Sequence, residues 1–327
     1  MLAFLDTGPP LEGLNARRVT QLEAIRLVAS GRYRAVICGL GGRLVLPGAY
    51  VAARLRGIPF VLWATIWDHP RTLAHRLSWR PTKYLYRHAD AVATYGVHVS
   101  AYVERYRRGA GTVFVAPQAV DVDHFAAPQS RGAVERAGAR AGAGEGDSLF
   151  LFVGRLEPEK GVENLLSAWR RADLGPGARL AFAGSGPLEH EIARQEGVRV
   201  LGYVHRSELP ALYAAADVLV LPSVRTATFR EPWGLVVNEA MLQRTPVIAS
   251  DAVGAAAGGL VADGRTGLVF PERDERALAH HLRTLATDAS LRHGLGEAAR
   301  ERAAALDPAA WADGMRAALA SVAVARS

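Results

Sequence analysis

The stretch Leu149–Trp169, "LFLFVGRLEPEKGVENLLSAW", changes from a strand pattern to a helix pattern within a few residues. A run of apolar residues leads to Gly154, a polar loop carries Arg155 and Lys160, and Gly161 precedes apolar residues at helical spacing. The two glycines free the backbone where the chain must turn. A buried strand, a glycine-containing loop and a covering helix together form the repeating unit of a parallel α/β sheet.

The same alternation extends in both directions from this stretch. Short runs rich in Val, Leu and Ala alternate with helical stretches such as residues 16–30 and 98–108. They form two series and predict an α/β fold of two doubly wound, Rossmann-like lobes facing a central cleft, with ligands at the carboxyl ends of the strands. The expected strands are residues 35–40, 59–65, 91–96 and 112–117 in the first series, and 148–154, 178–184, 198–203, 216–223, 245–251 and 267–270 in the second.

Length also favours two lobes, because 327 residues exceed the usual size of one domain. Residues 126–148 are poor in large apolar side chains and rich in Gly and Ala, which is typical of a linker. We therefore expect an N-terminal lobe over residues 1–140 and a C-terminal lobe over residues 141–308, with a C-terminal helix at 309–327 completing the first lobe.

Membrane-spanning and secreted proteins are not indicated by the sequence. No charge-free apolar run approaches the roughly 18 residues of a spanning helix, and the first residues lack a signal-peptide pattern. We expect a cytoplasmic protein. The single cysteine, Cys38, lies in an apolar stretch and is interpreted as a structural thiol.

The net charge of +7 is concentrated in the front of the chain, where residues 1–140 hold 19 Lys and Arg against 9 Asp and Glu. One interpretation is a solvated charged face, and the other is peripheral docking on an anionic membrane surface, the cytoplasmic leaflet. A nucleic-acid partner is not expected, because no recognised nucleic-acid module accompanies the charge. The basic residues Arg76, Arg80, Lys83, Arg87, Arg105 and Arg107 are interleaved with Trp79, Tyr84, Tyr86, Tyr102 and Tyr106.

The stretch Arg230–Met241, "REPWGLVVNEAM", combines two carboxylates with a helix start. Pro232 and Gly234 place Glu231 in a loop before a helix that includes Glu239. The backbone N–H groups near Gly234 and Leu235 can bind a phosphate, while carboxylates accept hydrogen bonds from hydroxyls. The stretch fits a ligand with a phosphate between two sugars, a nucleotide diphosphate sugar. Two ordinary helix glutamates are the alternative interpretation.

Arg155 and Lys160 strengthen the first interpretation. Both follow the carboxyl end of a predicted strand, where a planar guanidinium and a compact ammonium can neutralise a diphosphate. Taken alone, they could equally be exposed loop cations.

Two other patterns are weaker. The Asp-x-Asp sequence at Asp121–Asp123 has the composition of a metal site, but it follows a predicted strand as a turn, and we expect no metal there. His69, near the end of a front strand, is either a residue of the expected cleft or a histidine at a helix start.

The ordered motifs "VGRLEPEKG", "AGSGPL", "VRVLGYV", "ADVLVLPS", "EPWGLVVNEAM", "TPVIASD" and "DGRTGLVF" resemble the family 4 glycosyltransferases, which have the GT-B fold and retain anomeric configuration. The resemblance is close over residues 149–271 and looser in the front lobe. It implies that Arg155 and Lys160 hold the donor diphosphate, Glu231 the transferred sugar and Glu239 the ribose hydroxyls.

The same resemblance implies further contacts. The backbone at Gly234 and Leu235 would contact phosphate, and Tyr203 and Val204 would border the base. His69 would touch the donor sugar, although a strict match to the family pattern places that role at Trp67 or Asp68. No cofactor is implied beyond the nucleotide-sugar donor, and the scheme requires no metal. The N-terminal lobe would hold the acceptor, a lipid-linked or saccharide hydroxyl of the kind used in cell-surface polysaccharide or glycolipid synthesis.

The opening residues depart from the family pattern. Members of the family normally begin with a strand and a glycine-rich loop, whereas residues 1–18 read "MLAFLDTGPPLEGLNARR". We therefore expect a shortened N-terminal lobe. The alternative to an active transferase is a non-catalytic scaffold that binds nucleotide or membrane. A glycoside hydrolase using the two glutamates fits poorly, because a phosphate-binding helix end lies between them.

Overall fold

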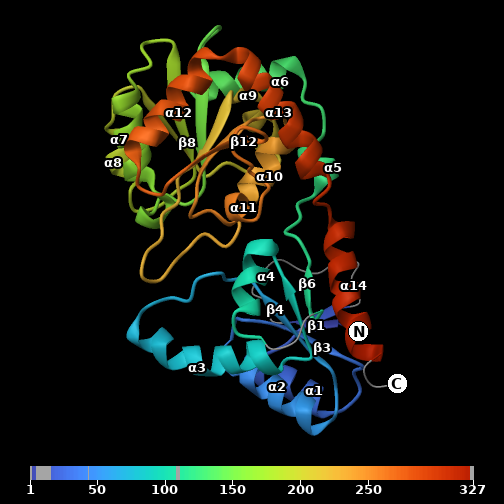
Figure 1. Ribbon diagram of the computed structural model, residues 1–327. Helices are drawn as coiled ribbons and strands as arrows, with labels where there is room; N and C mark the ends of the chain where they lie inside the picture. The colour runs from blue at the N-terminus through green and yellow to red at the C-terminus, as the bar shows by residue number, and fades with distance from the viewer. Residues whose placement is uncertain (1, 5–15, 43, 108–110, 325–327) are drawn as a thin grey trace. The chain divides into compact units, whose positions relative to one another are not determined.

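The computed structural model describes residues 2–4, 16–42, 44–107 and 111–324, and it contains three parallel sheets (Figure 1). The expected strands are all present, so the predicted α/β class is confirmed. A two-stranded sheet pairs β1 (Leu2–Phe4) with β2 (Ala16–Arg18). A four-stranded sheet has the order β3 (Val36–Gly39), β4 (Phe60–Ala64), β5 (Ala91–Thr94) and β6 (Val113–Val115). A six-stranded sheet has the order β12 (Gly267–Phe270), β11 (Val247–Ser250), β10 (Val218–Leu221), β7 (Ser148–Val153), β8 (Ala178–Ala183) and β9 (Val198–Gly202).

The chain divides into two compact units. Unit 1 comprises residues 1–69, 73–116 and 312–327, and unit 2 comprises residues 70–72 and 117–311. Unit 1 contains α1 (Gln21–Ala29), α2 (Val45–Leu55), α3 (Leu73–His88) and α4 (Val97–Glu104). Unit 2 contains α5 (Val122–Phe125), α6 (Arg131–Arg140), α7 (Val162–Ala172), α8 (Glu189–Ala193), α9 (Leu209–Ala215), α10 (Leu235–Leu242), α11 (Gly254–Ala257), α12 (Glu275–Thr287) and α13 (Ala289–Ala304).

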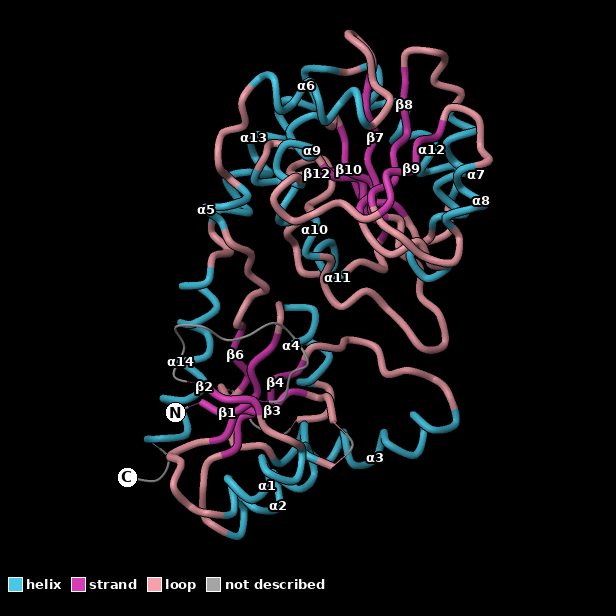
Figure 2. Tube along the Cα trace, turned by 180° about the vertical axis from the view of Figure 1, so that it is seen from behind, coloured by secondary structure: helices cyan, strands magenta, loops and turns pink. Residues whose placement is uncertain are grey.

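The sheet of unit 2 is covered on both faces. Helices α7, α8 and α12 lie on one face and α9, α10 and α13 on the other, as both views show (Figures 1 and 2). Strand β7 is buried along its length apart from Ser148, and Phe150, Phe152 and Phe182 are completely buried. Burial on both faces explains why these strands appear in the sequence as unbroken apolar runs.

The last helix, α14 (Pro308–Val324), connects the two units along the chain, since residues from 312 onward belong to unit 1. A Cβ at Gly314 would lie 2.2 Å from the backbone oxygen of Val115, at the end of β6. Glycine therefore permits the close approach of α14 to this sheet.

Two features of the chain differ from expectation. The stretch 16–30 is not one helix, because residues 16–18 form β2 and α1 begins at Gln21, where the Thr20 side chain accepts a hydrogen bond from the Glu23 N–H at 3.3 Å. The expected linker at 126–148 contains α6, which begins after Ser130 as N-cap and packs on α9. Its alanines favour helix, and a Cβ at Gly138 would lie 3.9 Å from the Ala215 Cβ.

One boundary between the units falls between Ala116 and Pro117. The lobe bounds expected from the sequence, 1–140 and 141–308, stay a prediction. At the front of the chain, β1 supplies an opening strand, although it pairs with β2 and not with the four-stranded sheet. Residues 5–15, where the opening sequence also departs from the family pattern, lie outside the described residues. The sheet of unit 1 is the smaller of the two large sheets.

Cys38 lies within β3, and burial raises the pKa of its thiol to about 11, which keeps the thiol protonated. Over the part of the chain that the structure describes, no helix has the length and apolar character needed to cross a bilayer.

Candidate functional site

The loops that follow β7 and β10 are joined at the carboxyl end of the sheet in unit 2. Gly161 has φ 69°, and a Cβ there would lie 1.9 Å from the backbone oxygen of Pro222. The Val224 N–H donates to the backbone carbonyl oxygen of Glu159 at 2.9 Å. These contacts hold the loop of Lys160 against the loop that leads to Glu231.

Lys160 and Glu231 form a largely buried ion pair at this junction. The Lys160 Nζ lies 2.5 Å from the Glu231 Oε2, and the side chains are 14% and 9% exposed. Ser223, directly after β10, donates from its Oγ to the same Glu231 oxygen at 3.0 Å. The ammonium also lies 5.0 Å from the centre of the Phe229 ring. Burial with several partners fixes the orientation of both charges.

Glu231 is positioned through its backbone as well. Its carbonyl accepts a hydrogen bond from the Gly254 N–H at 3.1 Å. A Cβ at Gly254 would lie 2.0 Å from the Pro232 oxygen, so only glycine allows α11 to approach the loop this closely.

The start of α10 lies next in the chain, and no side chain in the described part of the structure caps it. Gly234 has φ 94°, and a Cβ there would lie 2.7 Å from a methyl group of Leu221. Leu235 is the first helical residue and is 40% exposed. An uncapped helix start presents backbone N–H groups, which suit an anion.

Arg155 follows β7, but its guanidinium is paired within its own loop. It contacts the carboxylate of Glu157 and lies 3.7 Å from that of Glu159. The side chain is 58% exposed. Its predicted role at the donor diphosphate stays a prediction.

Glu239 lies in the second turn of α10 and is held by a residue that the sequence analysis did not single out. The buried Tyr213 of α9 donates its hydroxyl to the Glu239 Oε2 at 2.6 Å. Burial raises the pKa of the Glu239 carboxyl, while the Tyr213 hydrogen bond and the charges of Arg206 and His124 lower it.

The Asp-x-Asp pattern has a structural role in the fold. Asp121 caps α5 by accepting from the His124 N–H at 3.1 Å, and its other oxygen accepts from Arg206 at 3.1 Å. The His124 N–H and then Arg206 hold the pKa of Asp121 below its usual value. Among the described residues, no group of three His, Cys, Asp or Glu side chains has the arrangement of a metal site.

The two residues predicted to border the base, Tyr203 and Val204, follow β9. Tyr203 is 74% exposed, whereas Val204 is buried. His69 belongs to unit 1, where it follows β4 and its ring lies 4.5 Å from that of Trp79. The predicted ligand contacts of these three residues stay predictions.

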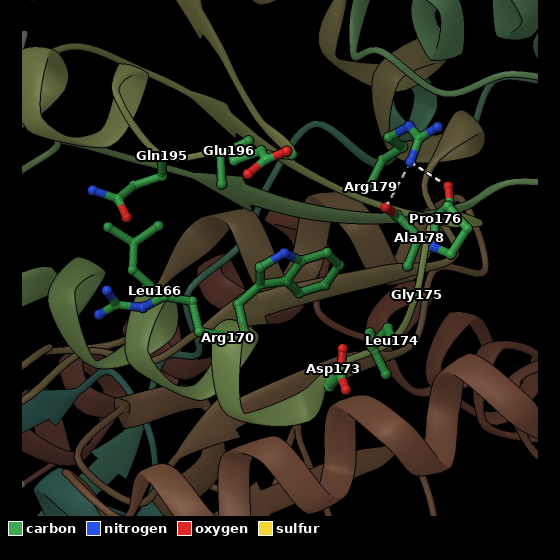
Figure 3. A pocket seen from close by; sticks show the side chains of 13 residues that line it. Leu166, Arg170, Asp173, Leu174, Gly175, Pro176, Ala178, Arg179, Gln195 and Glu196 are labelled. Carbon is green, nitrogen blue, oxygen red and sulfur yellow. Dashed lines mark hydrogen bonds between the residues drawn. The ribbon is translucent and has the colours of Figure 1, made fainter.

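A separate cavity of about 690 Å³ lies at the opposite, amino end of strands β8 and β9 (Figure 3). Its lining mixes both signs of charge, with Arg170 and Arg179 against Asp173 and Glu196. It contains none of the residues at the Lys160–Glu231 junction, so it is distinct from the candidate site.

Sequence reasoning missed Tyr213 and Ser223. Tyr213 stands in an otherwise apolar helix, where a buried hydroxyl needs a polar partner, and Ser223 directly follows a strand. These two patterns indicate that each hydroxyl has a hydrogen-bond partner, but they do not predict which residue it is.

The candidate site lies within a stretch of the chain that matches a known family. The sequence model of the family described as "Glycosyl transferases group 1" matches residues 135–302, just over half of the chain. This segment contains Arg155, Lys160, Glu231 and Glu239.

Curated relatives carry several activities. A D-inositol 3-phosphate glycosyltransferase of Kineococcus radiotolerans is 33% identical over 225 residues, which is 62% of this chain and 50% of the relative. A glycogen synthase of Mycobacterium tuberculosis is 35% identical over 48% of this chain and 38% of its own. An alpha-D-kanosaminyltransferase of Streptomyces kanamyceticus is 28% identical over 84% and 72%. The chain thus spans about half the length of the first of these relatives, and less of the second.

Solved structures share the fold. Anabaena Alr3699/HepE, in complex with UDP-glucose, has a TM-score of 0.74 at 20% identity, over 92% of this chain and 82% of its own. WaaG, a glycosyltransferase involved in lipopolysaccharide biosynthesis, has a TM-score of 0.61 at 17% identity, over 93% and 94%. The predicted GT-B fold is confirmed, and with the match over residues 135–302 the chain belongs to the glycosyl transferases group 1 family.

Proposed function

We propose that this chain is a retaining glycosyltransferase that binds a nucleotide diphosphate sugar in unit 2 and transfers the sugar to a hydroxyl acceptor. The observation that carries the proposal is the buried Lys160–Glu231 pair beside the uncapped start of α10. A cation, a carboxylate and free backbone N–H groups match the phosphate and hydroxyls of such a donor. Family membership supports the same activity.

The donor would lie across the carboxyl ends of the strands. Lys160, Arg155 and the backbone at Gly234 and Leu235 would hold the diphosphate. Glu231 would accept hydrogen bonds from the transferred sugar and Glu239 from the ribose, while Tyr203 and Val204 would border the base and His69 would contact the donor sugar. Because a related fold holds UDP-glucose, a UDP sugar is the first donor to test.

The reaction would depend on electrostatics and positioning. The bond between the sugar's anomeric carbon and the diphosphate oxygen breaks, and the acceptor oxygen attacks from the same face. The acceptor proton passes to the leaving phosphate oxygen. Lys160 and the α10 amides would stabilise the negative charge that grows on the diphosphate, and removal of one such group typically costs about 3 kcal/mol in the transition state.

The acceptor would be a lipid-linked or saccharide hydroxyl held by unit 1. The basic and aromatic residues of that unit support contact with an anionic membrane surface, on the cytoplasmic side. Cell-surface polysaccharide or glycolipid synthesis is the corresponding process.

Calorimetric titration with UDP, GDP and ADP sugars tests the donor site. We expect micromolar binding of one nucleotide, lost in Lys160→Ala and Glu239→Ala. Lys83→Ala is a matched control, because Lys83 is the chain's other lysine and lies in unit 1. Absence of binding by the folded protein would refute the site, while binding without donor hydrolysis or transfer to any acceptor would favour the non-catalytic scaffold.

A further inference from the structure

We propose that Tyr213 is a positioning residue: it fixes the Glu239 carboxylate for the ribose and so gives the site its preference for ribonucleotide over 2′-deoxyribonucleotide donors. The inference rests on the proposed function, because it assumes that Glu239 faces the ribose. It adds a residue that does not touch the ligand but determines how the ligand is recognised.

The Tyr213 hydroxyl is held rigidly against the Glu239 carboxylate. Tyr213 is completely buried in α9, and its hydroxyl donates to the Glu239 Oε2 at 2.6 Å. The backbone of the same helix is held by Thr245, whose Oγ1 donates to the Tyr213 carbonyl at 2.7 Å. The ring of Phe125 lies 6.4 Å away on the α5 side. A packed ring with a fixed backbone has little freedom, so its hydroxyl is a rigid anchor.

One oxygen of Glu239 is thereby engaged, and the other remains for a ligand. The described residues supply no hydrogen bond to Oε1, and the side chain is partly exposed. A hydrogen bond from a hydroxyl to a carboxylate is charge-assisted and short. It holds the carboxylate plane in one orientation, which is the requirement for accepting a hydrogen bond from a ribose hydroxyl.

The electrostatics favour the same role. Burial alone would push Glu239 toward its neutral form, which is a poorer acceptor, and the Tyr213 hydroxyl opposes this effect. Burial also raises the pKa of Tyr213, so the phenol stays a donor. The other charged groups that act on Glu239 are Arg206, from the loop after β9, and His124 of α5.

Tyr213→Phe tests the inference, because it removes one oxygen and leaves the ring. The dissociation constants of the ribonucleoside diphosphate that binds wild-type protein and of its 2′-deoxy counterpart would be measured by calorimetry. We expect the ribonucleotide to bind about tenfold more weakly to the variant, as for loss of a hydrogen bond to a charged group. The 2′-deoxynucleotide should change little, so the ratio of the two constants should fall.

Tyr86→Phe is the matched control. Tyr86 is also completely buried, but it lies in α3 of unit 1 and its hydroxyl has no hydrogen-bond partner among the described residues. The ratio of the two constants should keep its wild-type value in this variant. Thermal melts establish that both variants fold, and Tyr213→3-fluorotyrosine, which keeps the hydroxyl as a stronger donor, should retain the ribonucleotide preference.

The outcomes separate the two proposals. An unchanged ratio in folded Tyr213→Phe protein, with normal binding by wild type, overturns the role of Tyr213 and leaves the proposed function intact. Loss of preference in the 3-fluorotyrosine protein also overturns it. Failure of wild-type protein to bind any nucleotide overturns the proposed function, and the inference with it.

Discussion

The ion pair between Lys160 and Glu231 distinguishes Glu231 from Glu239, because only Glu231 would compete with the donor diphosphate for the charge of Lys160. Glu231 neutralises the cation that the diphosphate would use, so the ligand must share Lys160 with a buried carboxylate. In Glu231→Gln, the amide can still accept from Ser223 but carries no charge. We expect the nucleoside diphosphate to bind about threefold more tightly, a gain below ~1 kcal/mol, and transfer to fall by about 100-fold.

Calorimetry with the nucleoside diphosphate and a transfer assay with the sugar donor measure these two effects. Glu135→Gln is the control, because it neutralises a carboxylate of an exposed ion pair in α6. Weaker diphosphate binding in Glu231→Gln, matching that of Lys160→Ala, would contradict the idea that the carboxylate competes for the cation.

The raised pKa of Glu239 leads to a prediction of how donor affinity depends on pH. Its carboxylate would accept a ribose hydroxyl more strongly than the neutral carboxyl would, and burial raises the pKa of this group above the usual value. Affinity should therefore fall as the pH falls through this raised pKa, earlier than for an ordinary carboxyl group. In Tyr213→Phe the pKa should rise further, so the fall should begin at a higher pH.

Titrations from neutral to mildly acidic pH measure this difference. The phosphates of the ligand also titrate in this range, but they are common to wild type and variant. The shift between the two curves thus reports on Glu239, and identical curves would show that Tyr213 has no influence on its ionisation.

The sequence predicted part of the candidate site because some of its residues have a recognisable spacing. Lys160 follows a strand and a glycine turn, and Glu231 precedes a helix start, so a local pattern indicated each of them. Tyr213 and Ser223 could not be predicted in the same way, because their partners lie 26 and 8 positions away in other elements. Such contacts depend on tertiary packing, which local patterns do not encode.

Strands were predicted more reliably than element boundaries in this fold. Parallel strands buried on both faces need unbroken apolar runs, as in β7 and β10, and these are visible in the sequence. Helix α6 was missed because it has no buried residues of its own, so it lacks an apolar stripe. Its contact with α9 depends on small residues, which resemble a linker.

The turn before α7 is the element on which the position of Lys160 depends. Gly161→Ala would force a left-handed φ of 69° on alanine and bring its Cβ within 1.9 Å of the Pro222 oxygen. We expect the free energy of unfolding to fall by about 3 kcal/mol and nucleotide affinity to fall as Lys160 moves away from Glu231. Urea unfolding and calorimetry measure the two effects.

Gly175→Ala is the matched control for this substitution. Gly175 has a similar φ of 75°, but nothing lies within 4 Å of its added Cβ. The left-handed backbone conformation alone should lower the free energy of unfolding of Gly175→Ala by about 1 kcal/mol. The variant should bind nucleotide normally. Equal losses of stability in the two variants would show that the close approach to Pro222 is unimportant.

The two units are not consecutive segments of the chain, because unit 1 is built from residues 1–69, 73–116 and 312–327. Residues 117–140 belong to unit 2 because α5 is anchored there: Arg206 pairs with Asp121, and the Gln243 side chain donates to the Phe125 and Ala127 carbonyls. After residue 117 the chain stays in unit 2 until residue 311 and then returns to unit 1 in α14. The anchoring of α5 could not be predicted from the sequence, because it consists of long-range polar contacts.

The surface of unit 1 includes a helix face that suits an anionic membrane. Helix α3 contains no acidic residue. Tyr84 is 51% exposed and stacks on His88, and the exposed Arg80 and Arg87 lie four and three positions away on the same side. The buried Leu85 and Tyr86 fix the opposite side. An exposed ring surrounded by basic groups combines the two attractions that hold a helix at a lipid interface.

This face predicts binding to anionic vesicles that depends on salt. Each basic residue near an anionic leaflet contributes about 1 kcal/mol, so Arg80→Glu/Arg87→Glu should weaken co-sedimentation with phosphatidylserine vesicles by more than about tenfold. Arg136→Glu/Arg302→Glu makes the same change in net charge at exposed positions in unit 2 and should bind as wild type. Raising the salt concentration should release the wild-type protein, because screening shortens the reach of the attraction. Equal binding by the two double variants would contradict docking through α3 and leave its charges as a solvated face.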